Sequence, residues 1–416
     1  MCGGRVAVVG GSVAGCAAAL ALHRGGTDEV VVLERAPGRP AERGVGLAVH
    51  DDRYDELESA GYLDARMPWI QLERRRWYVR DTRGPAVGRR IGEMPFPFRT
   101  YNWGPLWHEL RARVPDAVEF RTGTTVGALQ HGPDAVELHT TDREGRRRRE
   151  PFDLAVGADG YRSLIRTEVC SEVCAEPVAA LRPEFAGYLA WRGAFPASRM
   201  TASDQRLWDV EECAYVVFPG GHVIIYRIPD SAGGHRVNWV LYTAPPPDLD
   251  LSLETPVSLP PGTLTDALHT HLARIAAELL PPYWGALVAL TEPGELFVQP
   301  LYDFTAPRYA TGRLLLTGDA ATVARPHTGA GAVKALQDAT ALESALRSAS
   351  DWAEALHTYD SERIAVGRAT VELGRRPGHA LVETTPERGS MNPSALDVWW
   401  QRAAVGGGLG GRALHA

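Results

Sequence analysis

Lysine, cysteine and long apolar runs are scarce in this chain of 416 residues. Lys334 is the only lysine, against 43 arginines. The five cysteines are odd in number and irregularly spaced, which favours unbridged thiols in a reducing compartment over a disulfide framework. No apolar run reaches the roughly 18 residues that a membrane span needs, and the first residues lead into an expected strand instead of a secretion signal. We therefore expect a cytoplasmic protein without membrane partners.

The charge balance narrows the classes of partner. A net charge of -7 argues against a general nucleic-acid binder. The 44% hydrophobic content is enough to bury a large core, and the length allows two or three domains. We expect a soluble monomer or homodimer whose partners are small molecules.

The start of the chain predicts a strand, a helix and a second strand. Residues 5–9 form a β-branched run that fits a buried strand, and an Ala- and Leu-rich stretch up to about Arg24 fits a helix. A second apolar run, residues 30–33, closes with Glu34. This order is typical of a dinucleotide-binding βαβ unit.

The turn between the first strand and the helix has the residues that such a unit needs. Gly10 permits the tight turn, Gly15 lets helix and strand pack closely, and the helix N-terminus offers N–H groups to a pyrophosphate. Glu34, 19 residues past Gly15, can accept both ribose hydroxyls. Ser12 replaces the usual second glycine and is small enough to fit. The alternative is an ordinary strand-turn-helix with glycines for packing.

Two later stretches place an acidic turn after an apolar strand. Residues 153–158 lead into Asp159, and residues 312–317 lead into Asp319. A carboxylate at a strand end is a fixed acceptor for sugar hydroxyls, and a charge-assisted hydrogen bond of that kind contributes about 1.5–3 kcal/mol. For an isolated aspartate the alternative is a turn former or a helix N-cap.

A Pro- and Gly-rich loop at residues 325–331 follows the second acidic turn and opens a helix. The three motifs, in this order and spacing, resemble the FAD-dependent aromatic hydroxylases of the p-hydroxybenzoate hydroxylase class. Residues 188–193, which read YLAWRG, and residues 325–327, which read RPH, are most similar to the branch that contains 2,6-dihydroxypyridine 3-hydroxylase. The resemblance covers roughly residues 5–380.

The resemblance implies an α/β fold with a discontinuous Rossmann-like FAD-binding domain, an inserted substrate domain and a C-terminal helical segment. The alternating pattern of residues 188–243 supports a mostly antiparallel sheet that would form the floor of a substrate pocket. We expect the FAD-binding domain to comprise residues 1–72, 101–172 and 305–392. The substrate domain should comprise residues 73–100 and 173–304. Residues 393–416 should form a flexible tail.

The resemblance also implies roles for particular residues. Asp159 matches an acid implicated in both FAD and NAD(P)H binding, and Asp319 matches the carboxylate that holds the ribityl chain of FAD. The loop from Pro326 to Gly331 matches the segment against the flavin ring, and its helix would direct a positive end toward the reduced flavin. The expected FAD contacts are Gly10, Ser12, Val13, Gly15, Glu34, Arg35, Arg43, Gly46, Trp103, Val126, Asp159, Asp319, Pro326, Gly329, Ala330 and Gly331.

The activity that the resemblance implies is aromatic hydroxylation. NAD(P)H would reduce non-covalently bound FAD, O2 would add at flavin C4a, and the hydroperoxyflavin would hydroxylate an electron-rich aromatic or heteroaromatic small molecule. His327 and Tyr226 are the candidates for proton transfer, and no metal is expected. Lys334 is a candidate for an electrostatic role near the flavin or a helix-bound carboxylate, with a solvated helix residue as the alternative.

Other outcomes on the same scaffold stay open at this point. They are epoxidation, Baeyer–Villiger insertion, oxidative decarboxylation and an FAD-binding protein that is not an oxygenase. The sequence does not distinguish NADH from NADPH.

Overall fold

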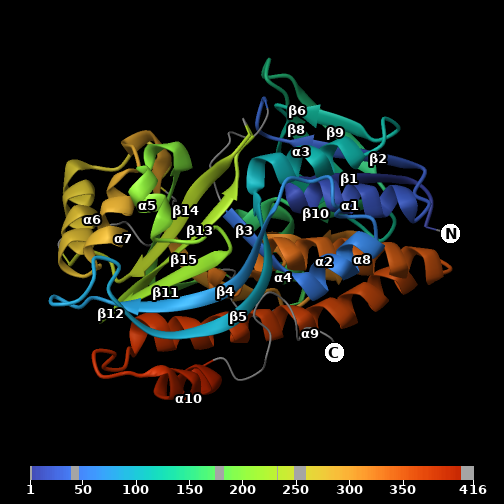
Figure 1. Cartoon of the computed structure of the whole chain (residues 1–416). Coiled ribbons are helices and arrows are strands. Elements are labelled where there is room, and N and C mark those ends of the chain that lie inside the picture. The colour runs from blue at the N-terminus through green and yellow to red at the C-terminus, as the bar shows by residue number, and fades with distance from the viewer. Residues whose placement is uncertain (1, 39–45, 174–181, 232, 248–258, 404–416) are drawn as a thin grey trace.

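Three sheets organise the computed structural model of this chain (Figure 1). The structure describes residues 2–38, 46–173, 182–231, 233–247 and 259–403. Within these ranges, no helix combines the length and the apolar character that crossing a lipid bilayer requires.

The first sheet has six strands in the order β16-β17-β10-β1-β2-β6. Every neighbouring pair is parallel except β16 with β17. Helix α1 (Val13–Arg24) joins β1 to β2, which confirms the predicted βαβ unit. The strands are β1 (Arg5–Val9), β2 (Glu29–Glu34), β6 (Glu119–Thr122), β10 (Leu154–Gly157), β16 (Ala310–Thr311) and β17 (Leu314–Leu316).

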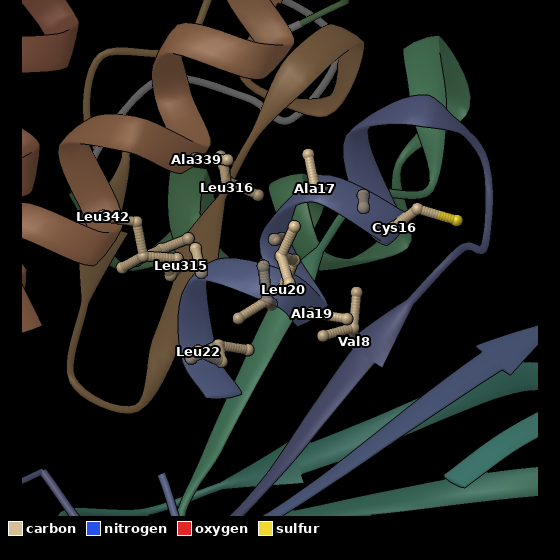
Figure 2. Close-up of a cluster of buried hydrophobic side chains, with 14 of the residues drawn as sticks. Val8, Cys16, Ala17, Ala19, Leu20, Leu22, Leu315, Leu316, Ala339 and Leu342 are labelled. Atoms are coloured by element: carbon tan, nitrogen blue, oxygen red, sulfur yellow. The ribbon is translucent and has the colours of Figure 1, made fainter. Parts of the chain in front are cut away.

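Helix α1 packs between the first sheet and helix α8 (Ala330–Ser348). Figure 2 shows Leu20 of α1 in one buried cluster with Val8 of β1, Leu315 of β17 and Leu342 of α8. Fully burying a side chain of this size contributes about 1.5–3 kcal/mol, so this cluster fixes α1 and α8 on the sheet.

Two glycines set how closely α1 approaches the sheet. A Cβ atom at Gly15 would lie 1.9 Å from the carbonyl oxygen of Gly10, which is far inside any non-bonded contact. Gly10 has φ 103°, and a Cβ atom there would lie 2.3 Å from the carbonyl oxygen of Ala158. Both positions therefore require glycine, as the sequence predicts.

The second sheet has nine strands in the order β18-β15-β11-β14-β13-β12-β4-β5-β3, antiparallel except for β12 with β4. A tight turn at residues 219–220 joins β12 to β13. The strands are β3 (Gly46–His50), β4 (Ile70–Val79), β5 (Arg89–Asn102), β11 (Glu184–Pro196), β12 (Glu212–Phe218), β13 (Gly221–Pro229), β14 (His235–Thr243), β15 (Leu296–Thr305) and β18 (Thr322–Val323). β3 joins this sheet although the predicted division assigns it to the FAD domain, and the domain boundaries stay a prediction.

Alternate residues of the second sheet face two different environments. Trp191 and Trp239 face helices α6 (Asp266–Glu278) and α7 (Pro282–Ala289), where they join a buried cluster. Tyr188, three residues before Trp191 on β11, belongs to the cluster on the opposite face. That opposite face borders the cavity described below.

Helix α9 (Trp352–Gly378) runs along both large sheets and contacts α8, β15 and β16 (Figure 1). It continues into a π-helical turn (His379–Glu383). The remaining elements are α2 (Asp51–Ser59), α3 (Trp103–Arg113), α4 (Leu164–Val173), α5 (Ala202–Arg206) and the three-stranded sheet of β7 (Thr125–His131), β8 (Val136–Thr141) and β9 (Arg147–Phe152).

Helix α10 (Pro393–Ala403) occupies the start of the segment predicted to be a flexible tail. Leu396 and Trp400 are buried, and the ring of Trp400 lies 5.1 Å from that of Trp77 on β4. The prediction is wrong for this helix, because an apolar pair at i and i+4 gives it a face that the sheet covers. Residues 404–416 lie outside the described residues.

Gly15→Ala should lower the free energy of unfolding by about 1–3 kcal/mol, because the added methyl group must displace the Gly10 carbonyl. Chemical denaturation measures this change. Gly127→Ala on β7 is the control, since no atom lies within 4 Å of a Cβ atom there. It should change stability by less than about 0.5 kcal/mol. Equal stabilities for the two variants would contradict the close packing at Gly15.

Candidate functional site

The ends of four parallel strands bring the predicted cofactor residues to one edge of the first sheet. Leu33, Val9, Gly157 and Leu316 pair in a single row across β2, β1, β10 and β17. Gly10, Glu34, Asp159 and Asp319 each follow one of these residues within a few positions. The carboxyl edge of a parallel sheet is where nucleotides bind in folds of this class.

The side chain of Glu34 is held at this edge by backbone groups. Its Oε2 accepts a hydrogen bond from the Gly11 N–H at 2.7 Å, and its Oε1 accepts one from the Ala36 N–H at 2.7 Å. Each carboxylate oxygen can accept a second bond, so Glu34 retains capacity for ribose hydroxyls. Ser12 is exposed and makes no capping bond to α1, which leaves the helix N–H groups available.

Two aspartates at the same edge have oxygens without partners. Asp159 Oδ2 accepts a hydrogen bond from the Leu164 N–H at 2.7 Å, whereas its Oδ1 is buried and has no partner among the described residues. Burial raises the pKa of the Asp159 carboxyl group. The Asp319 carboxylate accepts no hydrogen bond from the residues that the structure describes. It is open to the cavity described below, while protein atoms surround it on its other sides and keep most water away. Both aspartates therefore retain acceptors for a ligand, although Asp159 Oδ2 also accepts the N–H of Leu164 at the start of α4.

The loop before α8 brings backbone N–H groups to the same place. Gly329 has φ 65° and precedes α8 without a side chain that could cap the helix. Thr328 Oγ1 accepts a hydrogen bond from the Ala330 N–H at 3.3 Å, which leaves the N–H groups of the next residues, Gly331 and Ala332, for a ligand. Pro326, Gly329 and Gly331 border the cavity that also contains Asp319, while Ala330 is buried. A helix N-terminus favours negative charge. Acceptors for hydroxyls and donors for anions thus occur together, which fits a dinucleotide such as FAD.

A cavity of about 250 Å³ lies between this loop, β3 and the inner face of the second sheet. A dry cavity of about 150 Å³ is enough for benzene, so this one has room for a substituted ring. The side chains on its sheet side include Arg192, Cys213, Tyr215, Ile224, Tyr226 and Tyr242.

His327 borders the cavity and is held by a tyrosine. Its Nε2 lies 2.6 Å from the hydroxyl of Tyr188, and the guanidinium of Arg325 lies 5.3 Å from the centroid of the same tyrosine ring. The Nδ1 of His327 is buried and has no partner among the described residues. Arg325 is anchored in turn by Asp303 at 2.9 Å and by Glu383.

A second buried histidine lies beside the first. The ring of His222 on β13 is stacked on Tyr242 at 4.8 Å and lies 5.4 Å from the ring of His327. Burial lowers the pKa of His327 to about 3, and the charges of Arg325 and Arg192 act in the same direction. Burial also lowers the pKa of His222 well below its usual value. Both imidazoles are therefore neutral at pH 7.

Arg192 on β11 gives the cavity a positive charge. Among the described residues it is the one arginine or lysine that borders the cavity, and it forms no ion pair with any of them. Its Nε is buried without a partner in the described part of the chain. Arg75 adds a second buried charge behind the wall, with its guanidinium 5.0 Å from the ring centroid of Tyr215. Asp319 is the one acidic residue among those that border the cavity in the described ranges.

Tyr226, the other predicted proton-transfer residue, borders the cavity from β13 and is 8% exposed. Burial raises the pKa of its hydroxyl, so the tyrosine is protonated at neutral pH. A Cβ atom at Gly46 would lie 2.6 Å from this hydroxyl. Gly46 therefore packs directly against Tyr226 at the start of β3.

For several other predicted contacts the structure gives only their exposure and packing. Arg35 is exposed, and Trp103 and Val126 are half-buried against the core of the first sheet. Val13 is buried in α1, and Arg43 lies outside the described residues. Their roles as cofactor contacts stay predictions.

Lys334 does not border the cavity. Its side chain is 2% exposed, and Nζ donates a hydrogen bond to Asp338 Oδ2 at 2.6 Å. The alternative of a solvated helix residue is therefore wrong. The partner is a carboxylate on the same helix, which was one of the expected possibilities.

Sequence reasoning missed Tyr188, Arg192 and His222. A signal was available, since Tyr188 and Arg192 are four apart on one strand, as are His222 and Tyr226 on another, so that each pair shares a face. Which of the two faces borders a cavity depends on where α6 and α7 pack, and the strand pattern does not contain that information.

Comparisons with known proteins agree with this geometry. Residues 273–373 match a family described as FAD binding domain, and residues 185–303 match one described as FAD binding domain-like. A 2,6-dihydroxypyridine 3-monooxygenase from Paenarthrobacter nicotinovorans is 29% identical over 378 residues, which span 88% of each chain. A 3-amino-4-hydroxybenzoate 2-monooxygenase from Streptomyces cremeus is 30% identical over 388 residues, which span 89% of this chain and 85% of the relative.

A solved structure shows the same fold. The 2,6-dihydroxypyridine-3-hydroxylase from Arthrobacter nicotinovorans superposes with a TM-score of 0.77, at 24% sequence identity, over 94% of this chain and 96% of its own. The predicted α/β architecture with a Rossmann-like FAD domain and a C-terminal helical segment is therefore confirmed.

The neutral histidines should make stability depend on pH. Unfolded histidine binds a proton near pH 6.5, whereas folded His327 stays neutral down to about pH 3, so acid favours the unfolded state. The free energy of unfolding should be unaffected by His327 above pH 7 and fall below about pH 6.5, by up to about 1.4 kcal/mol per pH unit. Denaturation of the wild type and His327→Gln between pH 7 and pH 5 measures the slope of the free energy of unfolding against pH, which should be shallower in the variant.

His23→Gln, at an exposed histidine, is the control and should keep the wild-type slope. Parallel slopes for the wild type and His327→Gln would show that the imidazole is not held neutral.

Proposed function

This chain belongs to the FAD-dependent aromatic hydroxylases, and we propose that it hydroxylates a small aromatic ring that carries a negative charge. Membership rests on the Streptomyces cremeus relative, which is 30% identical over 388 residues. The chain is an FAD-dependent monooxygenase with NAD(P)H as its co-substrate. The observation that supports a negatively charged substrate is the position of Arg192 at the cavity.

The strand edge of the first sheet would hold FAD. Glu34 would accept the ribose hydroxyls, the N–H groups at the start of α1 would receive the pyrophosphate, and Asp319 would hold the ribityl chain. The N-terminus of α8 would face the flavin and favour negative charge there. When bound, FAD supplies the redox chemistry, since it accepts a hydride from NAD(P)H and activates O2. The partnerless oxygens of Asp159 and Asp319 support this assignment.

The proposal of an anionic substrate rests on the surroundings of Arg192. The guanidinium lies in a largely apolar and aromatic wall without a carboxylate partner among the described residues. A charge left without a partner in such a wall is unfavourable, and a carboxylate or an ionised ring hydroxyl of a ligand would supply the partner. The Streptomyces cremeus relative acts on a benzoate, whose carboxylate would serve this purpose.

His327 and Tyr226 would hold the substrate by donating hydrogen bonds. Nε2 of His327 is engaged by Tyr188, so a proton on the partnerless Nδ1 would be the one that the neutral imidazole offers to a ligand. Burial raises the pKa of the Tyr226 hydroxyl and keeps it protonated. Both groups would then be donors at neutral pH and would suit oxygen atoms on the ring. The aromatic side chains around them exclude water, which strengthens these bonds.

Further features of the protein are part of the same proposal. O2 is the proposed oxidant, and a monomer or homodimer is the proposed assembly. The cysteines that the structure describes are buried and form no disulfide with one another, which supports a reducing, cytoplasmic location.

The purified protein should carry bound flavin, visible as absorbance near 450 nm. Asp319→Asn should weaken FAD binding by about 10- to 150-fold, the equivalent of one charge-assisted hydrogen bond. Flavin fluorescence titration of the apoprotein measures this affinity. Asp55→Asn, at an exposed aspartate on α2, should leave it unchanged. Wild-type protein that binds no FAD would refute the proposed function.

Arg192→Met should raise the Kd for a hydroxybenzoate by about 10- to 150-fold and leave that for the matching hydroxybenzamide within about threefold, because only the acid pairs with the guanidinium. The measurement is substrate-stimulated flavin reduction by NAD(P)H, with each ligand titrated. Arg206→Met, at an exposed arginine on α5, is the control. Equal losses for acid and amide would exclude pairing with Arg192.

Product analysis separates the remaining reaction types. Hydroxylation adds one oxygen atom to an intact ring, whereas Baeyer–Villiger insertion enlarges a ring or forms an ester and oxidative decarboxylation releases CO2. Mass spectrometry and NMR of the product of the best substrate should therefore show a new phenolic hydroxyl group.

A further inference from the structure

Lys334 stands apart from every other basic residue of the chain. The remaining 43 positions of this kind are arginine. Its Nζ lies 2.6 Å from Asp338 Oδ2 and 5.0 Å from the ring centroid of Tyr309. With 2% of its surface exposed, it is a buried ammonium in the second turn of α8.

Asp338, its partner, joins three separate parts of the fold. Its Oδ2 also accepts a hydrogen bond from the Gly318 N–H at 3.0 Å, and its Oδ1 accepts one from Arg363 Nε on α9 at 2.8 Å. The carboxylate is fully buried. Burial raises its pKa, but Lys334 and Arg363 overcome this effect, and the pKa lies below its usual value. An ionised Asp338 therefore holds the turn that begins at Gly318.

This turn is the one that places Asp319. Gly318 has φ 57°, and a Cβ atom there would lie 2.7 Å from the Cβ of Ala14 in α1, so the turn is confined from both sides. Its N–H is fixed by Asp338, and the next residue carries the carboxylate proposed for the ribityl chain. Burial raises the pKa of Asp319, and the charges of Lys334 and Arg166 oppose that rise. Lys334 thus acts on both carboxylates.

The shape of the site explains why lysine is found here. Arg363 already occupies one side of the Asp338 carboxylate and the Gly318 N–H shares the other, which leaves room for a compact ammonium on one oxygen. A second guanidinium is larger than an ammonium and commonly uses two parallel hydrogen bonds to a carboxylate, so at this position it would compete with the Gly318 N–H.

We propose that Lys334 is a positioning residue for FAD: its ammonium holds Asp338 on the Gly318 N–H and so keeps Asp319 in place for the cofactor, a task that arginine cannot perform. This inference rests on the proposed function, because it assigns Asp319 to FAD. It concerns affinity for the cofactor and requires no particular substrate.

The test is a double-mutant cycle on FAD affinity, measured by fluorescence titration of apoprotein. Lys334→Met should weaken FAD binding at least tenfold in the wild-type background and less than twofold in the Asp319→Asn background, because the effect passes through Asp319. Lys334→Arg should behave like Lys334→Met. Arg347→Met removes the ion pair of an exposed arginine with Glu343, four residues earlier on the same helix, and should leave FAD affinity unchanged.

Two results would overturn the inference. One is wild-type FAD affinity in Lys334→Met or in Lys334→Arg. The other is an equal loss of FAD affinity in the wild-type and Asp319→Asn backgrounds, which indicates a general structural role. Wild-type protein that fails to bind FAD refutes the proposed function instead, and that titration is made first.

A second measurement applies if Lys334→Met does not fold. Lys334 is the single lysine, so an amine-acylating reagent reports on it directly by peptide mass spectrometry. Saturating FAD should slow its acylation at least tenfold in the wild type and less than twofold in Asp319→Asn. Equal protection in the two proteins overturns the inference.

Discussion

The parallel register of four strands is the constraint on which the site depends. Leu33, Val9, Gly157 and Leu316 are paired in one row, so the chain leaves β2, β1, β10 and β17 at the same level. A shift of one residue in any pair would turn alternate side chains to the other face and move the turn that follows. The close contact of Gly15 with Gly10 holds α1 against this row, and Asp338 holds the turn after β17.

The second sheet contributes a wall with two different faces. Tryptophans such as Trp191 and Trp239 fill one face against α6 and α7. Tyrosines, histidines and Arg192 occupy the other face, where the loop before α8 closes the cavity. Both faces carry a large buried apolar cluster, and on the cavity side this cluster surrounds polar atoms, such as Arg192 Nε, that have no hydrogen-bond partner among the described residues.

Burial and charge together determine what the cavity can bind. Removal of water keeps His327 and His222 neutral by lowering the pKa of each, while Arg192 remains a cation without a carboxylate beside it among the described residues. On the cofactor side, Lys334 and Arg166 oppose the effect of burial on Asp319. The site therefore has neutral donors and one positive charge where the ring would lie, and carboxylates where sugar hydroxyls would lie.

The sequence by itself determined the βαβ unit, the three cofactor motifs and the family, because these depend on local patterns: a turn that requires glycine, an apolar run that ends in an acid, and a fixed order along the chain. It gave the wrong state for residues 393–403, whose apolar pair Leu396 and Trp400 is buried only because β4 and β5 lie opposite. The tertiary structure alone decided that Tyr188 reaches His327, that Arg192 faces a cavity and that Lys334 is buried beside Asp338. These contacts join residues from different strands and helices, and the energy of a buried charge depends on which groups surround it in space.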